Sequence, residues 1–160
     1  ETELKSRKEA FEDAISATKA AIEEGIVPGA GMALLRTIDA IEQEAKHAES
    51  DEKTGILILR RALEAPARQI AENSGADGGV IVEKMIAGNG DTGFDASQNQ
   101  FVDLYKAGII DPTKVVRVAL ENAVSVAGTL LLTEATITEL EEKPNRFNED
   151  GERTLEDEIE

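Results

Sequence analysis

The sequence contains no cysteine and only one histidine, and aromatic residues make up 3% of its 160 residues. Without cysteine, neither a disulfide framework nor a thiolate site can form. The single histidine, His47, stands in a polar segment and excludes a metal site built from several histidines. There is also no Gly-x-Ser-x-Gly motif of a nucleophilic hydrolase. The apolar content comes from Ala, Val, Ile and Leu, which favours packed helices over a β-sandwich.

Acidic residues outnumber basic ones by 33 to 17, which gives a net charge of −16. This charge argues against binding to nucleic acid and to anionic membrane surfaces. We expect no apolar run long enough to span a bilayer and no targeting leader. A chain of this length can form one domain that buries roughly two-thirds of its unfolded surface. We therefore expect a soluble, acidic protein of a reducing compartment.

A stretch of seven residues, Gly25 to Gly31, holds three glycines and one proline and separates two helical patterns. Gly25 is placed to end the first helix in the left-handed conformation. Gly29 and Gly31 leave the backbone bare at the start of the next helix, where free amide groups can approach a phosphate or ribose. A simple helix–loop–helix turn explains the same glycines.

Periodic apolar residues predict a mainly helical, all-α fold. The expected helices cover residues 1–24, 31–48, 54–65, 66–73 and 80–86, and a strand is the less favoured alternative for 80–86. The helix over 54–65 is apolar on most of its faces, so we expect it to be buried. Residues 94–104 suggest a small β-hairpin. The run from Gly88 to Gly93 consists of turn-forming residues, and it lacks the Lys-Ser/Thr pair of a phosphate-binding loop.

The longest apolar helix is expected to begin at Asp111-Pro112, with Asp111 as the N-cap and Pro112 in the first helical position. Because this helix is apolar around nearly its whole circumference to Glu134, we predict that it is the buried central helix of the bundle. Residues 135–140 alternate and predict a C-terminal edge strand that needs a partner. The last segment, 141–160, reads as an acidic, disordered tail.

Five segments, in this order and at this spacing, resemble the group I chaperonins, the ring-forming protein-folding machines. The segments are Phe11–Ala14, Ala20–Gly31, Ala65–Asn73, Gly93–Ala96 and Ala107–Val115. Five ordered motifs are far more specific than any single glycine motif. The resemblance covers residues 3–140 and implies the C-terminal part of a subunit. It places an intermediate-domain helix and hinge at 1–28, the C-terminal half of the ATP-binding equatorial domain at 29–140, and the tail at 141–160.

The resemblance implies roles for the residues that match the family motifs. Asp13 matches the catalytic carboxylate, which the intermediate-domain helix brings to bound ATP so that it orients the attacking water. Gly29, Ala30 and Gly31 match the loop that meets the nucleotide sugar through its backbone. Asp111 matches the acid that accepts hydrogen bonds from the ribose hydroxyls.

By the same resemblance, Asp95, Ala96 and Ser97 match the tip that lies against the adenine. Arg68 and Asp77 stand where the family places charged contacts between its two stacked rings. The strand over 135–140 would pair with a neighbouring subunit.

As a whole, the resemblance implies an ATP hydrolase that encloses and refolds non-native proteins. It implies ATP, Mg²⁺ and K⁺ as cofactors, and no metal site within this chain alone. The implied partners are further copies of the subunit in stacked heptameric rings, non-native client proteins and a co-chaperonin lid. Neither nucleic acid nor membrane is an expected partner. The expected location is the bacterial cytoplasm, with an organellar matrix as the alternative.

Three features depart from the family pattern. Ala30 replaces a glycine, which is costly if its φ is positive. Asp95 replaces an asparagine, so an amide donor is lost. The tail is acidic where many members carry a Gly/Met-rich repeat.

The residues also allow plainer interpretations. Asp111 is explained by helix capping alone, and Arg68 and Asp77 by ordinary surface charge. An alternative function is an acidic helical module without nucleotide turnover, which binds a partner through the strand at 135–140.

Overall fold

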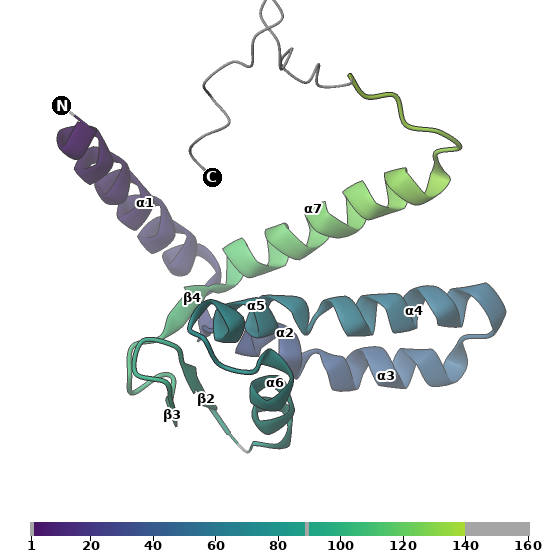
Figure 1. Cartoon of the computed structure of the whole chain (residues 1–160), viewed down its shortest axis with the longest axis horizontal. Coiled ribbons are helices and arrows are strands. Elements are labelled where there is room, and N and C mark those ends of the chain that lie inside the picture. Colours follow the sequence, from purple (N-terminus) through teal and green to yellow (C-terminus); the bar gives the residue numbers. More distant parts are fainter. Residues whose placement is uncertain (1, 89, 140–160) are drawn as a thin grey trace, which may run out of the picture. The chain divides into compact units, whose positions relative to one another are not determined.

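The computed structural model describes residues 2–88 and 90–139, and in them seven helices and four short strands follow one another (Figure 1). Contacts divide the chain into two compact units, residues 1–124 and 125–160. The helices are α1 (Thr2–Glu24), α2 (Met32–Arg36), α3 (Ile38–His47), α4 (Ser50–Ala62), α5 (Ala65–Asn73), α6 (Gly78–Ala87) and α7 (Thr113–Leu132). The strands are β1 (Ile26–Pro28), β2 (Thr92–Asp95), β3 (Gln100–Asp103) and β4 (Ile110–Pro112). The predicted mainly helical class is confirmed.

The predicted N-terminal helix is present as α1 and ends at Gly25, as expected. Gly25 has φ +82°, and its N–H donates to the carbonyl of Ala21 at 2.8 Å. A side chain is disfavoured at this φ, so glycine is the natural residue for the end of the helix. The chain then extends as β1.

Strand β1 pairs antiparallel with β4, a small sheet that the sequence did not reveal. Three residues form each strand, and the register places Val27 opposite Asp111. Such a short strand shows no period-2 pattern, and its partner lies far away along the chain. The chain between these two strands therefore leaves and returns to one place in the fold.

The helix predicted over 31–48 is divided into α2 and α3 at Thr37. The hydroxyl of Thr37 donates to the carbonyl of Leu34 at 2.7 Å, and the backbone N–H of Thr37 donates to the same oxygen at 3.1 Å. These bonds tighten the last turn of α2 and compete with a continuous α-helix. Apolar periodicity alone does not detect this break.

The hydrophobic core lies among α2, α5, α6 and the β2–β3 hairpin. Its buried members are Met32, Leu35, Ile38, Leu63, Ala67, Ala71, Ile81, Val82, Met85, Phe94 and Leu104. The predicted hairpin is present, and it pairs Phe94 with Phe101 at 5.7 Å between ring centroids. The core thus fixes the hairpin against the helices that follow the glycine-rich loop.

The prediction that the apolar segment 54–65 is buried is wrong for α4. Among the described residues of this helix none is buried, and Leu57 and Ile58 are exposed. Helix α4 packs along α3 (Figure 1), and this contact leaves much of its apolar surface exposed in the described part of the chain. An all-round apolar sequence therefore indicates faces that can be covered, not faces that this chain covers.

The same correction applies to the predicted central helix. Helix α7 forms as expected, but none of residues 113–132, all of which the structure describes, is buried. By length and composition α7 is long and apolar enough to cross a membrane, so the expectation that no run reaches this length is wrong. A single such helix is weak evidence, because the core helix of a water-soluble protein meets the same criteria.

The predicted edge strand at the C-terminal end is not formed in the part of it that the structure describes. Residues 135–139 belong to no helix or strand, while residue 140 and the predicted tail over 141–160 lie outside the described residues. Because a strand needs a hydrogen-bonded neighbour, an alternating segment stays irregular without its partner edge.

Two leucines close together in sequence test where the core lies. Leu63 is 2% exposed and Leu57 is 46% exposed. We expect Leu63→Ala to lower the free energy of unfolding by about 2–5 kcal/mol, because it leaves a cavity. Leu57→Ala should cost less than about 1 kcal/mol, since its side chain is half in water. Urea unfolding followed by circular dichroism measures both, and equal losses would contradict this placement of the core.

Candidate functional site

The β1–β4 pairing brings two predicted site elements together. The loop Gly29-Ala30-Gly31 follows directly on β1, and Asp111 lies in β4 opposite Val27. The pairing continues into the loop, where the N–H of Gly29 donates to the carbonyl of Ile109 at 3.0 Å. Two segments that lie far apart in the sequence therefore meet, and together they are called the corner.

The loop itself is held in a left-handed conformation at two successive residues, Ala30 with φ +54° and Gly31 with φ +74°. A Cβ on Gly31 would lie 2.7 Å from the backbone nitrogen of Ala67, so only glycine fits there. Ala30 occupies a conformation that is costly for an L-residue, and its methyl group packs against the core. Ala30, which stands where the family pattern has a glycine, is therefore strained, and the packing of its methyl group offsets part of that strain.

Helix α2 offers fewer free backbone amide groups at its start than the sequence predicted. Helix α2 has only five residues, and the N–H of Met32 already donates to the carbonyl of Gly29 at 2.9 Å. The loop therefore offers a bare, sharply turned backbone rather than the N-terminus of a long helix.

Asp111 is not the helix cap that the sequence indicated. It lies in β4, and α7 begins at Thr113, whose N–H donates to the carbonyl of Gly25 at 3.1 Å. Partial burial raises the pKa of the Asp111 carboxyl. Since no other described residue forms a hydrogen bond or ion pair with this carboxylate, it can accept hydrogen bonds from a ligand beside the loop.

Asp95 ends β2 at the tip of the hairpin and is buried, at 7% exposure. Its Oδ1 accepts hydrogen bonds from the Ser97 hydroxyl at 2.6 Å, the Ser97 N–H at 2.9 Å and the Gln98 N–H at 3.3 Å. The bond from the Ser97 hydroxyl is the main cause that holds the pKa of Asp95 below its usual range. Asp95 thus fixes the backbone of Ala96 and Ser97.

Asp13 is exposed on α1, about three turns before Gly25. Helix α1 contacts β4 near its C-terminal end. Within the described part of the chain, no hydrogen bond or ion pair engages the Asp13 side chain. The structure therefore joins the Gly29–Gly31 loop with Asp111, but it does not gather Asp13 with them.

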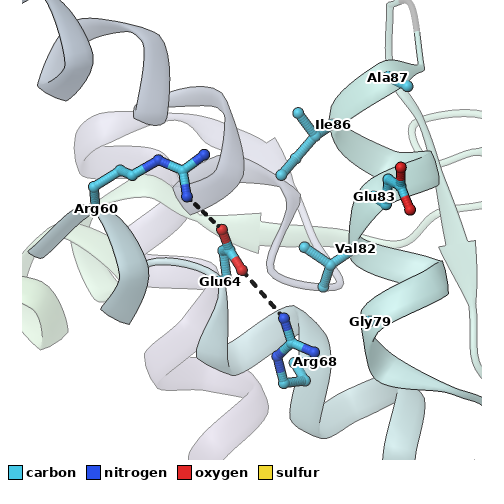
Figure 2. Close-up of a pocket in the computed structure, with 8 residues that line it drawn as sticks. All are labelled: Arg60, Glu64, Arg68, Gly79, Val82, Glu83, Ile86 and Ala87. Atoms are coloured by element: carbon cyan, nitrogen blue, oxygen red, sulfur yellow. Dashed lines mark hydrogen bonds and ion pairs between the residues drawn. The ribbon is translucent and has the colours of Figure 1, made fainter. Parts of the chain in front are cut away.

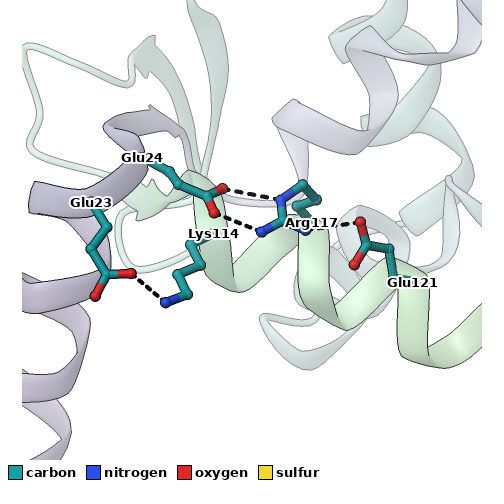
Figure 3. Close-up of polar contacts among 5 residues, drawn as sticks. All are labelled: Glu23, Glu24, Lys114, Arg117 and Glu121. Carbon is teal, nitrogen blue, oxygen red and sulfur yellow. Dashed lines mark hydrogen bonds and ion pairs between the residues drawn. The ribbon is translucent and has the colours of Figure 1, made fainter.

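The last turn of α1 is fastened to the first turns of α7 by ion pairs (Figure 3). Glu24 accepts two hydrogen bonds from Arg117, at 2.6 and 3.1 Å, and Glu23 pairs with Lys114. Arg117 also pairs with Glu121 at 2.9 Å. The bond from Arg117 lowers the pKa of Glu24, and the two glutamates raise the pKa of Arg117.

These ion pairs were missed from the sequence, because only the pair of Arg117 with Glu121 has helical spacing. The others join residues that come together through the β1–β4 pairing. The charged residues in the last turn of α1 were the sequence feature that could have indicated these ion pairs.

Arg68 and Asp77 both have local structural roles. Asp77 caps α6, with its Oδ1 accepting from the N–H of Val80 at 3.1 Å. Arg68 pairs with Glu64 at 3.2 Å, and Glu64 pairs with Arg60 at 2.8 Å, beside an open hollow between α4, α5 and α6 (Figure 2). Their predicted place between rings remains a prediction.

Residues 1–141 match the model of the TCP-1/cpn60 chaperonin family. The chain belongs to this family. It is 66% identical over 142 residues to chaperonin GroEL 5 of Bradyrhizobium diazoefficiens, covering 89% of this chain and 26% of that relative. The predicted resemblance to group I chaperonins is thereby confirmed.

The fold also resembles a solved chaperonin structure. A crystal structure of a group III chaperonin in the open state superposes with a TM-score of 0.68 at 30% identity, covering 74% of this chain and 25% of that one. This chaperonin chain therefore spans about a quarter of the length of the relatives it matches.

The loop conformation gives a paired prediction for the isolated chain. We expect Ala30→Gly to raise the free energy of unfolding by about 1 kcal/mol, because glycine adopts a positive φ without steric penalty. Gly31→Ala should lower it by more than about 1 kcal/mol, through strain and the clash with Ala67. Urea unfolding measures both variants, and a stability loss in Ala30→Gly would show that the methyl packing outweighs the strain.

The lowered pKa of Asp95 gives a pH prediction. Its folded pKa lies below the unfolded value, so its contribution is present above the unfolded pKa and is lost as pH falls through the folded pKa. Asp95→Asn keeps an oxygen at Oδ1 but removes the charge. We expect the wild type to be more stable than this variant at pH 7, with the difference shrinking below about pH 4. Urea midpoints between pH 7 and pH 2 measure it, and a constant difference would refute this role of the charge.

Proposed function

We propose that this chain supplies part of the ATP-binding and ATP-hydrolysing machinery of a chaperonin subunit that encloses and refolds non-native proteins. The observation that carries the proposal is the β1–β4 corner. It joins the Gly29–Gly31 loop to the carboxylate of Asp111, which no other described residue engages, in a chain of this family. Family membership supports nucleotide binding in general.

In this proposal the corner holds the nucleotide sugar. The backbone of Gly29, Ala30 and Gly31 lies against the sugar, because bare and turned backbone can approach it closely. Asp111 accepts hydrogen bonds from the vicinal ribose hydroxyls, which suit a carboxylate. The hairpin tip Asp95-Ala96-Ser97 lies against the adenine.

Asp13 is the proposed catalytic residue. In phosphoryl transfer the protein mainly positions the attacking water and stabilises charge, so one carboxylate on a movable helix suits this task. The hinge at Gly25 and the ion pairs of Figure 3 are where such movement of α1 would be controlled.

Mg²⁺ and K⁺ are the proposed metal ions of the reaction. Residues 2–88 and 90–139 contain no cluster of three or more candidate metal ligands. The proposal therefore assigns the ions to the phosphates and to parts of the subunit outside this chain, and it gives them no step here.

Assembly and partners follow the family in this proposal. Copies of the subunit form stacked heptameric rings, with Arg68 and Asp77 between the rings and segment 135–140 paired with a neighbouring subunit. A co-chaperonin lid closes the ring over non-native clients, in the cytoplasm.

A second candidate function is a partner-binding module of the same fold without nucleotide turnover. Two observations favour it: the strained Ala30, and Asp95, which is engaged in its own turn. Nucleotide binding by the complete subunit separates the two candidates.

The catalytic assignment is tested in the complete subunit with two variants of α1 that each remove one negative charge. We expect Asp13→Asn to lower ATP turnover at least a hundredfold with nearly unchanged ATP affinity, because the water loses its orienting group. Glu12→Gln should leave both nearly unchanged. Steady-state phosphate release and calorimetric ATP titration measure the effects, and full turnover by Asp13→Asn would end the assignment.

A further inference from the structure

Helices α3 and α4 form an arm, residues 38–62, which joins the rest of the fold at one end. Within the described residues, the main contact of α4 is with α3, and α3 otherwise contacts mainly α2 (Figure 1). The core lies at the root of this arm, where Ile38 and Leu63 are 3% and 2% exposed. The outer part of the arm therefore packs mainly on itself.

A helix is interrupted at each of the two points where the arm joins the fold. Thr37 separates α2 from α3, through its two bonds to the carbonyl of Leu34. Between α4 and α5 the N–H of Glu64 donates to the carbonyl of Arg61 at 3.3 Å, three residues back, and Pro66 has no N–H to donate. Helices bend at breaks of this kind. Two breaks at the same end of a helix pair have the geometry of a pivot.

A chain of ion pairs, which we call the strap, crosses the second break. Glu64 lies between two arginines: its Oε1 accepts from Arg60 at 2.8 Å and its Oε2 from Arg68 at 3.2 Å (Figure 2). Arg60 also donates to Glu42 of α3 at 2.9 Å. The strap therefore connects both helices of the arm to α5 through one carboxylate.

An open hollow of about 370 Å³ lies beside the strap, between α4, α5 and α6. Across it, the strap faces the apolar side chains of Val82 and Ile86 (Figure 2). Interlocked side chains would fix the arm on this side, as they do in a packed core. Here the arm has room to rotate, and ion pairs rather than packed apolar groups oppose the rotation.

We propose that the α3–α4 arm pivots at Thr37 and Glu64, and that Glu64 is the positioning residue that sets the angle of the arm. Removing this one carboxylate opens the strap toward both arginines and leaves the backbone bonds of the helices intact. The strap is in reach of solvent, since 15% of the Glu64 side chain and 33% of the Arg60 side chain are exposed. Salt therefore weakens it, and the angle of the arm responds to ionic strength.

The test measures a distance across the pivot in the full chain, whose lack of cysteine allows nitroxide labels to be placed at chosen positions. The label pair Lys53→Cys with Val80→Cys reports the distance from the far end of the arm to α6 by pulsed electron paramagnetic resonance. We expect Glu64→Gln to shift or broaden this distance by about 5 Å, the displacement that a rotation of about 15° gives at the end of an arm about 20 Å long. About 1 M salt should produce the same change in the chain with an intact strap.

Two controls separate a pivot from other changes. Arg61→Gln also removes one charge beside the second break, but Arg61 is exposed and forms no ion pair with a described residue, so the distance should stay as in the wild type. A label pair within the arm, Glu44→Cys with Lys53→Cys, should keep its distance in Glu64→Gln. A change within the arm would mean that its helices separate, which overturns the pivot.

The remaining outcomes also decide the matter. An unchanged distance between the labels at 53 and 80 in Glu64→Gln overturns the role of the strap, and so does an equal change in Arg61→Gln. Circular dichroism establishes that each variant keeps its helices. If Glu64→Gln does not fold, the salt series of the chain with an intact strap replaces it, and a distance that is the same at low and high salt contradicts the pivot.

Discussion

The pairing of β1 with β4 is the constraint on which the rest of this structure depends. It contains only three residues on each side, yet it closes the long excursion of chain that holds the core. It ends α1, starts α7 and sets the glycine-rich loop beside Asp111. Closing a long loop costs little more entropy than closing a medium one, so a few ladder bonds and a packed core suffice to hold it. Local sequence has no means of indicating such a contact.

Helix positions were the part of the fold that the sequence could predict. The glycine at position 25 and the apolar spacing before it located the end of α1, and the alternating residues around Phe94 located the hairpin. The break at Thr37 and the strand at Asp111 were missed, because each depends on a bond to one particular partner. Asp111 shows how a local sequence pattern and a contact with a distant partner can indicate different structures. Its position before Pro112 fits a helix cap, but its pairing opposite Val27 places it in a strand.

The site was predicted through family resemblance more than through residue chemistry. Spacing alone left Asp13 as an exposed acid, and the structure leaves it exposed as well. What the structure adds is the physical connection between the loop and Asp111, and the hydrogen bonds that occupy half of Asp95. The burial of α4 and α7 was predicted wrongly for one common reason. An apolar sequence indicates that a surface can be buried, whereas its burial depends on which elements pack against it, and none of the described residues of α4 or α7 is buried.

The junction at Gly25, where α1 meets the corner, connects Asp13, the glycine-rich loop and the ion pairs to α7. Helix α1 projects from the corner, and its last turn is bound to α7 through Glu24 and Arg117, which follow the corner on both sides. A rigid helix transmits a small rotation at its base into a larger displacement along its length, and Asp13 lies about three turns from that base. The ion pairs are partly exposed, so each is weak enough to break and reform. Paired backbone groups hold the corner, whereas partly exposed ion pairs join the last turn of α1 to α7. In the proposed function, a catalytic acid on α1 that arrives after the nucleotide is bound needs a fixed corner and a movable helix.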